Sequence, residues 1–171
     1  MVFLLRLLAC LFSSPFKHRL RPLDDSILTM RVWPNDLDLN MHANSSRYVG
    51  FMDVGRVDMV ARWGILWNVL RRGWRPIVGG SMITYRRSLL PFEKFRVRSR
   101  IIAWDEKWFY FEHVVERMNG DLSAMATVRG LARGPNGNVP PAEFMALAGH
   151  PGPSPPVPAY VTQWLASEAR K

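Results

Sequence analysis

Two acids, two amides and a histidine occupy every second position between residues 36 and 44: Asp36, Asp38, Asn40, His42 and Asn44. A carboxylate can act as a general base or nucleophile, and a histidine can orient a carbonyl or transfer a proton. The free backbone N–H groups at the start of a helix favour negative charge, such as the oxyanion that forms when a carbonyl is attacked. This combination in one short stretch indicates hydrolysis of an activated acyl group.

Two regular elements are expected to hold these side chains in place. The apolar residues 27–33 have the composition of a strand, which Pro34 ends because proline cannot donate to a strand ladder. A helical pattern follows over residues 44–67, with Asn44 or Ser45 as its N-cap. We therefore expect the polar side chains around the start of a long helix, where the N–H groups of residues 44–46 (Asn44, Ser45 and Ser46) would form the oxyanion site.

The sequence after Gly73 changes to the period of strands. Strands are expected at residues 77–90, 94–101, 108–117 and 122–133, and Pro91 stops the first of them. The last three are joined by short turns, one of them of the Asn-Gly type, so they form an antiparallel meander. A strand, a long helix and then a meander give an α+β fold class.

Segments of different composition flank this central part. We expect a leader at 1–24, one domain at 25–134, and a Pro- and Gly-rich tail at 135–171 with short helices near 143–147 and 159–170. The leader is apolar and begins with Met1, but Arg6 interrupts it and it is shorter than the roughly 20 apolar residues of a spanning helix. Basic residues follow it, and no acid precedes Asp24. Two interpretations stay open: contact with an anionic membrane surface through residues 1–21, or docking on the protein's own domain.

Composition limits the classes of function. A chain of 171 residues that is 48% hydrophobic can bury one sizeable core. The net charge of +9 suits nucleic acid, an anionic membrane or an anionic substrate. The aromatic residues lie in apolar alternation without a stacking motif, which argues against a nucleic-acid partner. The single cysteine, Cys10, allows no internal disulfide and indicates a reducing, cytoplasmic location, with or without peripheral membrane contact. We expect Cys10 to be inert and far from acids and bases, and the scattered histidines predict no metal site.

The motif also resembles a known family. Residues 36–44, followed by Tyr48, resemble the D-x-D-x-N-x-H-x-N-N-x-x-Y signature of the hot-dog-fold thioesterases, the superfamily of the 4-hydroxybenzoyl-CoA and acyl-CoA thioesterases. The segment from Thr84 to Arg87 is similar to the E-Y-R-R segment of plant acyl-carrier-protein thioesterases. Residues 89–100 and 104–110 resemble the thioesterase-superfamily-member-six group. Ser45 and Thr84 depart from the family pattern, since an asparagine and an acid stand at these positions in the family.

The resemblance implies a fold, an assembly and a set of site residues. The fold is the hot-dog fold, in which a curved antiparallel sheet wraps a long helix, and family members are dimers or dimers of dimers with active sites between subunits. Asp38 matches the acid assigned as general base or nucleophile, and Asn40 and His42 match residues that position the substrate. Substrate-binding roles carry over to four further residues: Tyr48, Thr84, Arg86 and Arg87.

These residues predict a hydrolase without a cofactor. Its reaction would convert the thioester of acyl-CoA, or of an acyl-carrier protein, to a free acid and a thiol. The departures at Ser45 and Thr84 leave one alternative open, a non-catalytic hot-dog domain that binds acyl-CoA or acyl chains.

Overall fold

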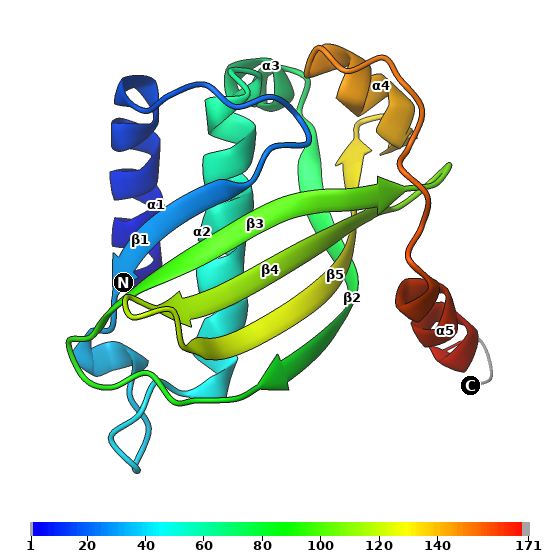
Figure 1. Ribbon diagram of the computed structural model, residues 1–171. Helices are drawn as coiled ribbons and strands as arrows, with labels where there is room; N and C mark the ends of the chain where they lie inside the picture. Colours follow the sequence, from blue (N-terminus) through cyan, green and yellow to red (C-terminus); the bar gives the residue numbers. More distant parts are fainter. Residues whose placement is uncertain (1, 169–171) are drawn as a thin grey trace.

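The computed structural model describes residues 2–168, in which one long helix, α2 (Ser45–Arg62), is wrapped by a curved antiparallel sheet (Figure 1). The strand order is β1-β3-β4-β5-β2, and β6 pairs with β5. This arrangement is the predicted α+β hot-dog fold. The strands are β1 (Ser26–Arg31), β2 (Arg75–Tyr85), β3 (Lys94–Trp104), β4 (Phe109–Arg117), β5 (Leu122–Gly134) and β6 (Gly137–Val139).

The core forms where α2 packs on the concave face of the sheet. Phe51 of α2 and Phe95 of β3 are both fully buried, with ring centroids 4.8 Å apart. Gly55 allows the helix to come this close, because a Cβ added there would lie 2.4 Å from Ser99 Oγ of β3. Burial of each such aromatic side chain contributes about 1.5–3 kcal/mol, so the helix–sheet contact is a main source of stability.

The predicted meander β3-β4-β5 is confirmed, and the strand predicted at 77–90 is corrected. That strand is β2, and it ends at Tyr85 because the N–H groups of Arg86 and Arg87 both donate to the carbonyl oxygen of Ser123. β2 pairs with β5 along its length, while β1 pairs with β3. One edge of the sheet is therefore β2, which pairs with no strand on its other side among the described residues.

The single helix predicted over residues 44–67 is correct as far as Arg62 and wrong at its C-terminal end. α2 ends at Arg62, Gly64 adopts a left-handed φ of +78°, and a separate helix α3 (Leu66–Arg71) follows. A glycine takes this conformation without strain, so the chain reverses direction here. Trp67 consequently lies on α3 and is 63% exposed, whereas Trp63 is buried in the core.

The leader forms helix α1 (Val2–Ser13), continued by the 3₁₀ turn η1 (Ser14–Phe16), and α1 packs beside α2. Cys10 is buried at this contact, with its Sγ 3.5 Å from Oδ1 of Asp58, so the expectation that it lies far from any acid is wrong. Burial and the Asp58 carboxylate raise the pKa of Cys10 to about 12, so the thiol is protonated and unreactive at neutral pH. Among the described residues, no helix has the length and apolar character needed to cross a bilayer.

The tail adds two helices and a strand that composition did not reveal, β6. α4 (Pro141–Leu147) covers one end of the sheet, where Phe144 packs on Trp74 and Phe109. α5 (Ala159–Glu168) begins where predicted, and the last residues of the predicted helix, 169–170, lie outside the described residues.

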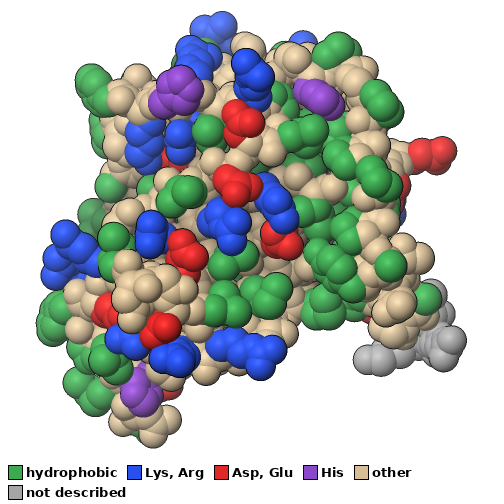
Figure 2. All heavy atoms as spheres, viewed as in Figure 1, with side chains coloured by type: hydrophobic (Ala, Val, Ile, Leu, Met, Phe, Trp, Pro, Cys, Tyr) green, Lys and Arg blue, Asp and Glu red, His purple; other side chains and the backbone are tan. Residues whose placement is uncertain are grey.

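The outer face of the sheet carries paired charges. Arg96 lies opposite Glu116 and Arg100 lies opposite Glu112 in the β3–β4 register, and each pair forms an ion pair. Figure 2 shows acidic and basic side chains lying next to one another over this face. These arginines therefore form the solvated strand face that the alternating pattern predicts.

Candidate active site

The polar stretch forms a tight loop between η2 (Pro34–Asp36) and the start of α2, and it projects from the lower edge of the domain in Figure 1. An isolated bridge joins Leu37 to Ala43, and the N–H of Asp38 donates to the carbonyl oxygen of His42 at 2.9 Å. Met41 closes the loop with a left-handed φ of 58°. The N–H of Ala43 donates to Leu89 O, which fastens the loop to the segment before β3.

The Asp38 carboxylate has one oxygen held and one oxygen free. Oδ1 accepts from the backbone N–H of Asn40 at 2.8 Å and from that of His42 at 3.4 Å. Oδ2 accepts no hydrogen bond from the described residues. The side chain is half-buried, so the loop orients the carboxylate and leaves one oxygen available.

Asn40 and His42 share this loop with Asp38, but their side chains are not joined to its carboxylate. Asn40 is exposed and His42 is half-buried. Neither side chain forms a hydrogen bond with another described residue. The catalytic roles of the three residues therefore stay predictions, and a triad linked within one chain is not formed.

Asn44 caps α2, as predicted. Its side-chain oxygen accepts from the N–H of Ser46 at 2.9 Å and from Ser46 Oγ at 2.8 Å. Its own N–H donates to Asp36 O at 2.7 Å. The N–H of Ser45 has no acceptor among the described residues, so of the three N–H groups predicted for an oxyanion only that of Ser45 is available.

The predicted substrate-binding residues tie the start of α2 to the end of β2. Tyr48 is buried, and its hydroxyl lies 3.0 Å from Ser123 Oγ, which in turn donates to Arg87 O. Tyr85 packs edge-on against Tyr48 and donates to Ser45 O at 3.2 Å. The side chains of Thr84, Arg86 and Arg87 are exposed, and Arg87 pairs with Asp121. Contact of any of these residues with substrate stays a prediction.

Asp36 stabilises the loop through a hydrogen bond and an ion pair. It is 2% exposed, accepts from the N–H of Trp33, and forms a two-point ion pair with Arg6 of α1. A doubly bonded Arg–carboxylate pair fixes geometry as well as charge. In the sequence, Arg6 stands out only as a lone charge in an apolar run.

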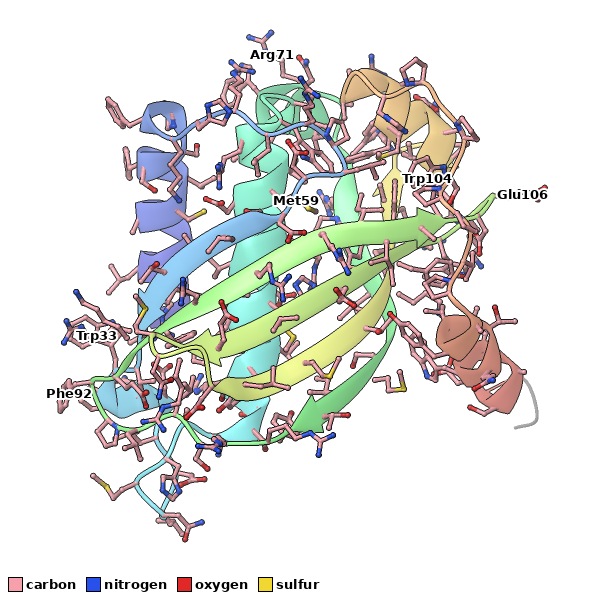
Figure 3. The ribbon with its side chains drawn as sticks, in the orientation of Figure 1. Trp33, Met59, Arg71, Phe92, Trp104 and Glu106 are labelled. Atoms are coloured by element: carbon pink, nitrogen blue, oxygen red, sulfur yellow. The ribbon has the colours of Figure 1, made fainter. Side chains whose placement is uncertain are left out.

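A cavity of about 480 Å³ lies between α2 and the sheet, and sequence reasoning missed it. It is lined by apolar side chains of eight helices and strands and by three charged residues, Asp53, Arg56 and Arg75. Its α2 wall extends from Asp53 to Val60, in the half of the helix remote from the Asp38 loop. Met59, which Figure 3 labels near the centre of the molecule, belongs to this wall. Cavities of this size and lining are typical sites for apolar ligands.

One polar network borders the cavity. The Arg56 guanidinium contacts Asp53 and lies 2.9 Å from Nε2 of His113, which is fully buried, and Nδ1 of His113 lies 2.8 Å from Ser99 Oγ. Arginine only donates, so Nε2 accepts and Nδ1 carries the proton. Burial lowers the pKa of His113 well below its ordinary value, and Arg56 lowers it further. His113 is thus a core histidine with both ring nitrogens hydrogen-bonded.

Comparison with known proteins places this geometry in a family. Residues 32–165 match the sequence model of the thioesterase-like superfamily. The chain is 35% identical to Protein THEM6 of Danio rerio over 71% of this chain and 59% of that protein. It is 31% identical to Protein THEM6 of Xenopus laevis over 87% of this chain and 73% of that protein.

A solved structure shares the fold. A Staphylococcus aureus protein in complex with CoA superposes with a TM-score of 0.64 at 18% identity, over 81% of this chain and 92% of that one. The overall fold thus recurs in a solved protein, and the family-model match extends over most of the chain. Because the family model matches most of its length, the chain belongs to the thioesterase-like superfamily.

Proposed function

We propose that the protein hydrolyses acyl-CoA thioesters, with Asp38 as the general base or nucleophile, in a homodimer that joins the Asp38 loop of one chain to the apolar cavity of the other. The observation that carries this proposal is the state of the Asp38 carboxylate. Backbone N–H groups hold one of its oxygens in place, and the other oxygen is free. The cytoplasmic location expected from the single cysteine is part of the proposal.

Within one chain, Asp38 is not among the residues that line the cavity. The first residue of α2 in the cavity wall, Asp53, lies eight residues beyond the helix start at Ser45. Eight residues correspond to about 12 Å along a helix axis, whereas reacting atoms must approach to about 3–3.5 Å. In the proposed dimer, the second chain would bring its cavity closer to Asp38.

The free edge of the sheet supplies a way to recruit that chain. β2 presents unpaired backbone groups, and its side chains Ile77, Val78 and Met82 are 38%, 49% and 39% exposed. Such an edge is a template for pairing with another strand. A two-fold axis that pairs β2 with its copy makes the two α2 helices antiparallel, so the start of each helix lies beside the second half of the other.

The chemistry follows from this placement. The free oxygen of Asp38 takes a proton from water as the water oxygen attacks the thioester carbon, or attacks that carbon directly to give an anhydride that water then cleaves. The C–S bond breaks, the electron pair leaves with sulfur, and the thiolate takes a proton to give the free thiol. The Ser45 N–H donates to the oxyanion, and loss of one such donor typically costs about 2.7–4 kcal/mol of transition-state stabilisation. His42 orients the carbonyl.

Two observations support an anionic acyl carrier as the substrate: similarity to a protein solved with CoA, and the positive charge of this chain. The Staphylococcus aureus protein with the same fold binds CoA. Arg86 is exposed beside the end of β2, where it would contact a phosphate of CoA or the phosphopantetheine of an acyl-carrier protein, and Arg87 lies next to it. The net charge of +9 favours either anionic carrier.

Replacement of the acid tests the proposal. We expect Asp38→Asn to lower acyl-CoA hydrolysis by about a hundredfold or more, as loss of a general base does, with thiol release followed by a chromogenic trap. Asp24→Asn is the matched control, because Asp24 also accepts a backbone N–H in its own turn and lies outside the loop. Hydrolysis at the parental rate by Asp38→Asn contradicts the proposal. Binding of acyl-CoA by the parent chain without thiol release across a panel of chain lengths favours the non-catalytic alternative.

A further inference from the structure

Helix α1 presents an apolar stripe to solvent although its opposite face packs on α2. The stripe consists of Leu4, Leu8 and Phe12 of α1 and Phe16 of the adjoining turn η1, which follow one another at intervals of four residues and are 56%, 41%, 76% and 91% exposed. Side chains at this spacing lie on one side of a helix. The α1 stripe is therefore an elongated apolar surface that the chain itself does not cover, and hydrophobic side chains are visible along the left margin of Figure 2, where α1 lies.

Positive charge borders the α1 stripe. Residues 2–23 contain no acid, and three of their basic side chains, His18, Arg19 and Arg21, are exposed just beyond Phe16. None of these three side chains forms an ion pair with a described residue. The end of α1 is thus basic as well as apolar.

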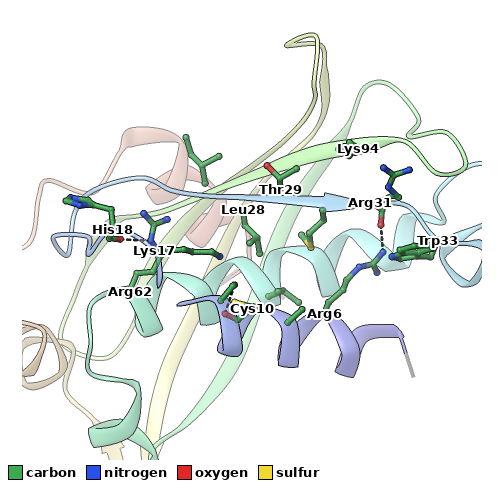
Figure 4. Close-up of a pocket in the computed structure, with 15 residues that line it drawn as sticks. Arg6, Cys10, Lys17, His18, Leu28, Thr29, Arg31, Trp33, Arg62 and Lys94 are labelled. Carbon is green, nitrogen blue, oxygen red and sulfur yellow. Dashed lines mark hydrogen bonds between the residues drawn. The ribbon is translucent and has the colours of Figure 1, made fainter. Parts of the chain in front are cut away.

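A basic groove continues this surface between α1 and β1. The groove has a volume of about 780 Å³, and Figure 4 shows basic side chains from both of its walls. Three of them are neutralised within the chain, since Arg6 pairs with Asp36 while Lys17 and Arg62 pair with Asp58. The other two, Arg31 and Lys94, have no acidic partner among the described residues and no acid lines the groove.

We propose that α1 lies in the surface of an anionic phospholipid bilayer, with the α1 stripe inserted and the anionic lipid head groups bound by His18, Arg19, Arg21 and the Arg31–Lys94 side of the groove. An interfacial helix of this kind combines an apolar face with basic residues at its border. A second copy of the chain fits less well, because a two-fold contact through this face would bring the same uncompensated cations together. The inference does not depend on hydrolysis, since none of its residues belongs to the Asp38 loop.

Vesicle binding tests the inference on the full chain. We expect the protein to co-sediment with vesicles of phosphatidylcholine and phosphatidylglycerol, and to bind pure phosphatidylcholine vesicles about tenfold or more weakly, because each basic residue near an anionic surface adds to binding. The double substitution Phe12→Ser with Phe16→Ser should weaken binding to anionic vesicles by about tenfold or more. Met118→Ser is the matched control, since Met118 is 49% exposed in the turn between β4 and β5.

Charge reversal gives an independent readout. Arg31→Glu with Lys94→Glu should lower binding to anionic vesicles and flatten its dependence on salt. Lys107→Glu, in the turn between β3 and β4 at the far side of the molecule, should not (Figure 3, where Glu106 marks that turn). Asp38→Asn should bind vesicles as the parent does, so failure of the hydrolysis proposal and of the bilayer proposal are separable.

Two outcomes would overturn the inference. One is equal binding to neutral and anionic vesicles, or none to either. The other is a change of oligomeric state in Phe12→Ser with Phe16→Ser, measured by sedimentation velocity without lipid, together with unchanged vesicle binding. The second outcome would assign the α1 stripe to contact between copies.

Discussion

If the acid and the cavity come from different chains, two inactive variants should restore activity when they form a dimer together. The first variant is Asp38→Asn, which keeps its cavity. The second fills the cavity by Val57→Trp with Val60→Trp, two half-buried positions of α2 that line it, and keeps its acid. Each variant should be inactive alone, because every site in its own homodimer lacks one component.

The expected recovery follows from the symmetry. A two-fold dimer holds two equivalent sites, each made from the Asp38 loop of one chain and the cavity of the other. In a heterodimer of the two variants, one site contains both the intact acid and the intact cavity, and the other contains neither. The heterodimer should therefore hydrolyse acyl-CoA at about half the parental rate per dimer, provided that the two sites act independently.

Co-expression of the variants with different affinity tags isolates the heterodimer, and thiol release gives its rate. The two homodimers, purified in parallel, control for residual activity, and size-exclusion chromatography confirms that all three assemblies have the same size. An inactive heterodimer of the correct size would refute the shared site and would place acid and cavity in the same chain. Activity in either homodimer near the parental rate would refute the assignment of its altered component.

Two further predictions concern stability, measured by urea unfolding. Burial and Arg56 lower the pKa of His113 in the folded protein, so below the ordinary histidine pKa of 6.5 the unfolded chain binds more protons than the folded one. The free energy of unfolding should therefore fall by about 1.4 kcal/mol for each pH unit below 6.5. The substitution His113→Gln should flatten this slope. Asp58→Ala should lower the free energy of unfolding by about 3 kcal/mol, because it leaves Lys17 and Arg62 without their buried partner. Adding Lys17→Met to this variant should recover part of the loss, since it removes one of the unpaired cations. If it recovers nothing, the ion pair with Lys17 is not the source of the stabilisation.

Much of the fold was predictable because the local period of apolar residues indicates where strands and helices form. The alternation over residues 94–101 and the Asn-Gly turn predicted the β3-β4-β5 meander, which the structure confirms. The break after Arg62 was not predicted, because the apolar period continues through Gly64 into α3 and only the left-handed φ of that glycine ends the helix. β6 was missed for a related reason, since three residues are too few to show a period.

The candidate site was predictable only in part, since its residues come together through contacts distant in sequence. The spacing of Asp38 and Asn44 predicted a loop at the start of α2 and the cap of that helix, and the structure has both. The cavity is lined by residues scattered over eight helices and strands, so no short motif encodes it. The link from Arg6 to Asp36 spans thirty residues, and neither side chain marks the other in the sequence.

The Arg6–Asp36 ion pair connects the leader to the candidate site. Arg6 is bonded to Asp36, and Asp36 in turn accepts the N–H of Trp33 and lies two residues before Asp38, so α1 braces the loop that carries the proposed acid. At its other end α1 is held through Lys17, which pairs with Asp58 of α2. These two charged contacts add to the apolar packing of the helix, because its detachment would leave the buried Asp36 carboxylate unpaired and would remove one of the two cations that pair with Asp58. A bilayer that binds the α1 stripe would therefore keep the Asp38 loop at a fixed distance from the lipid surface, because Arg6 connects the leader to that loop.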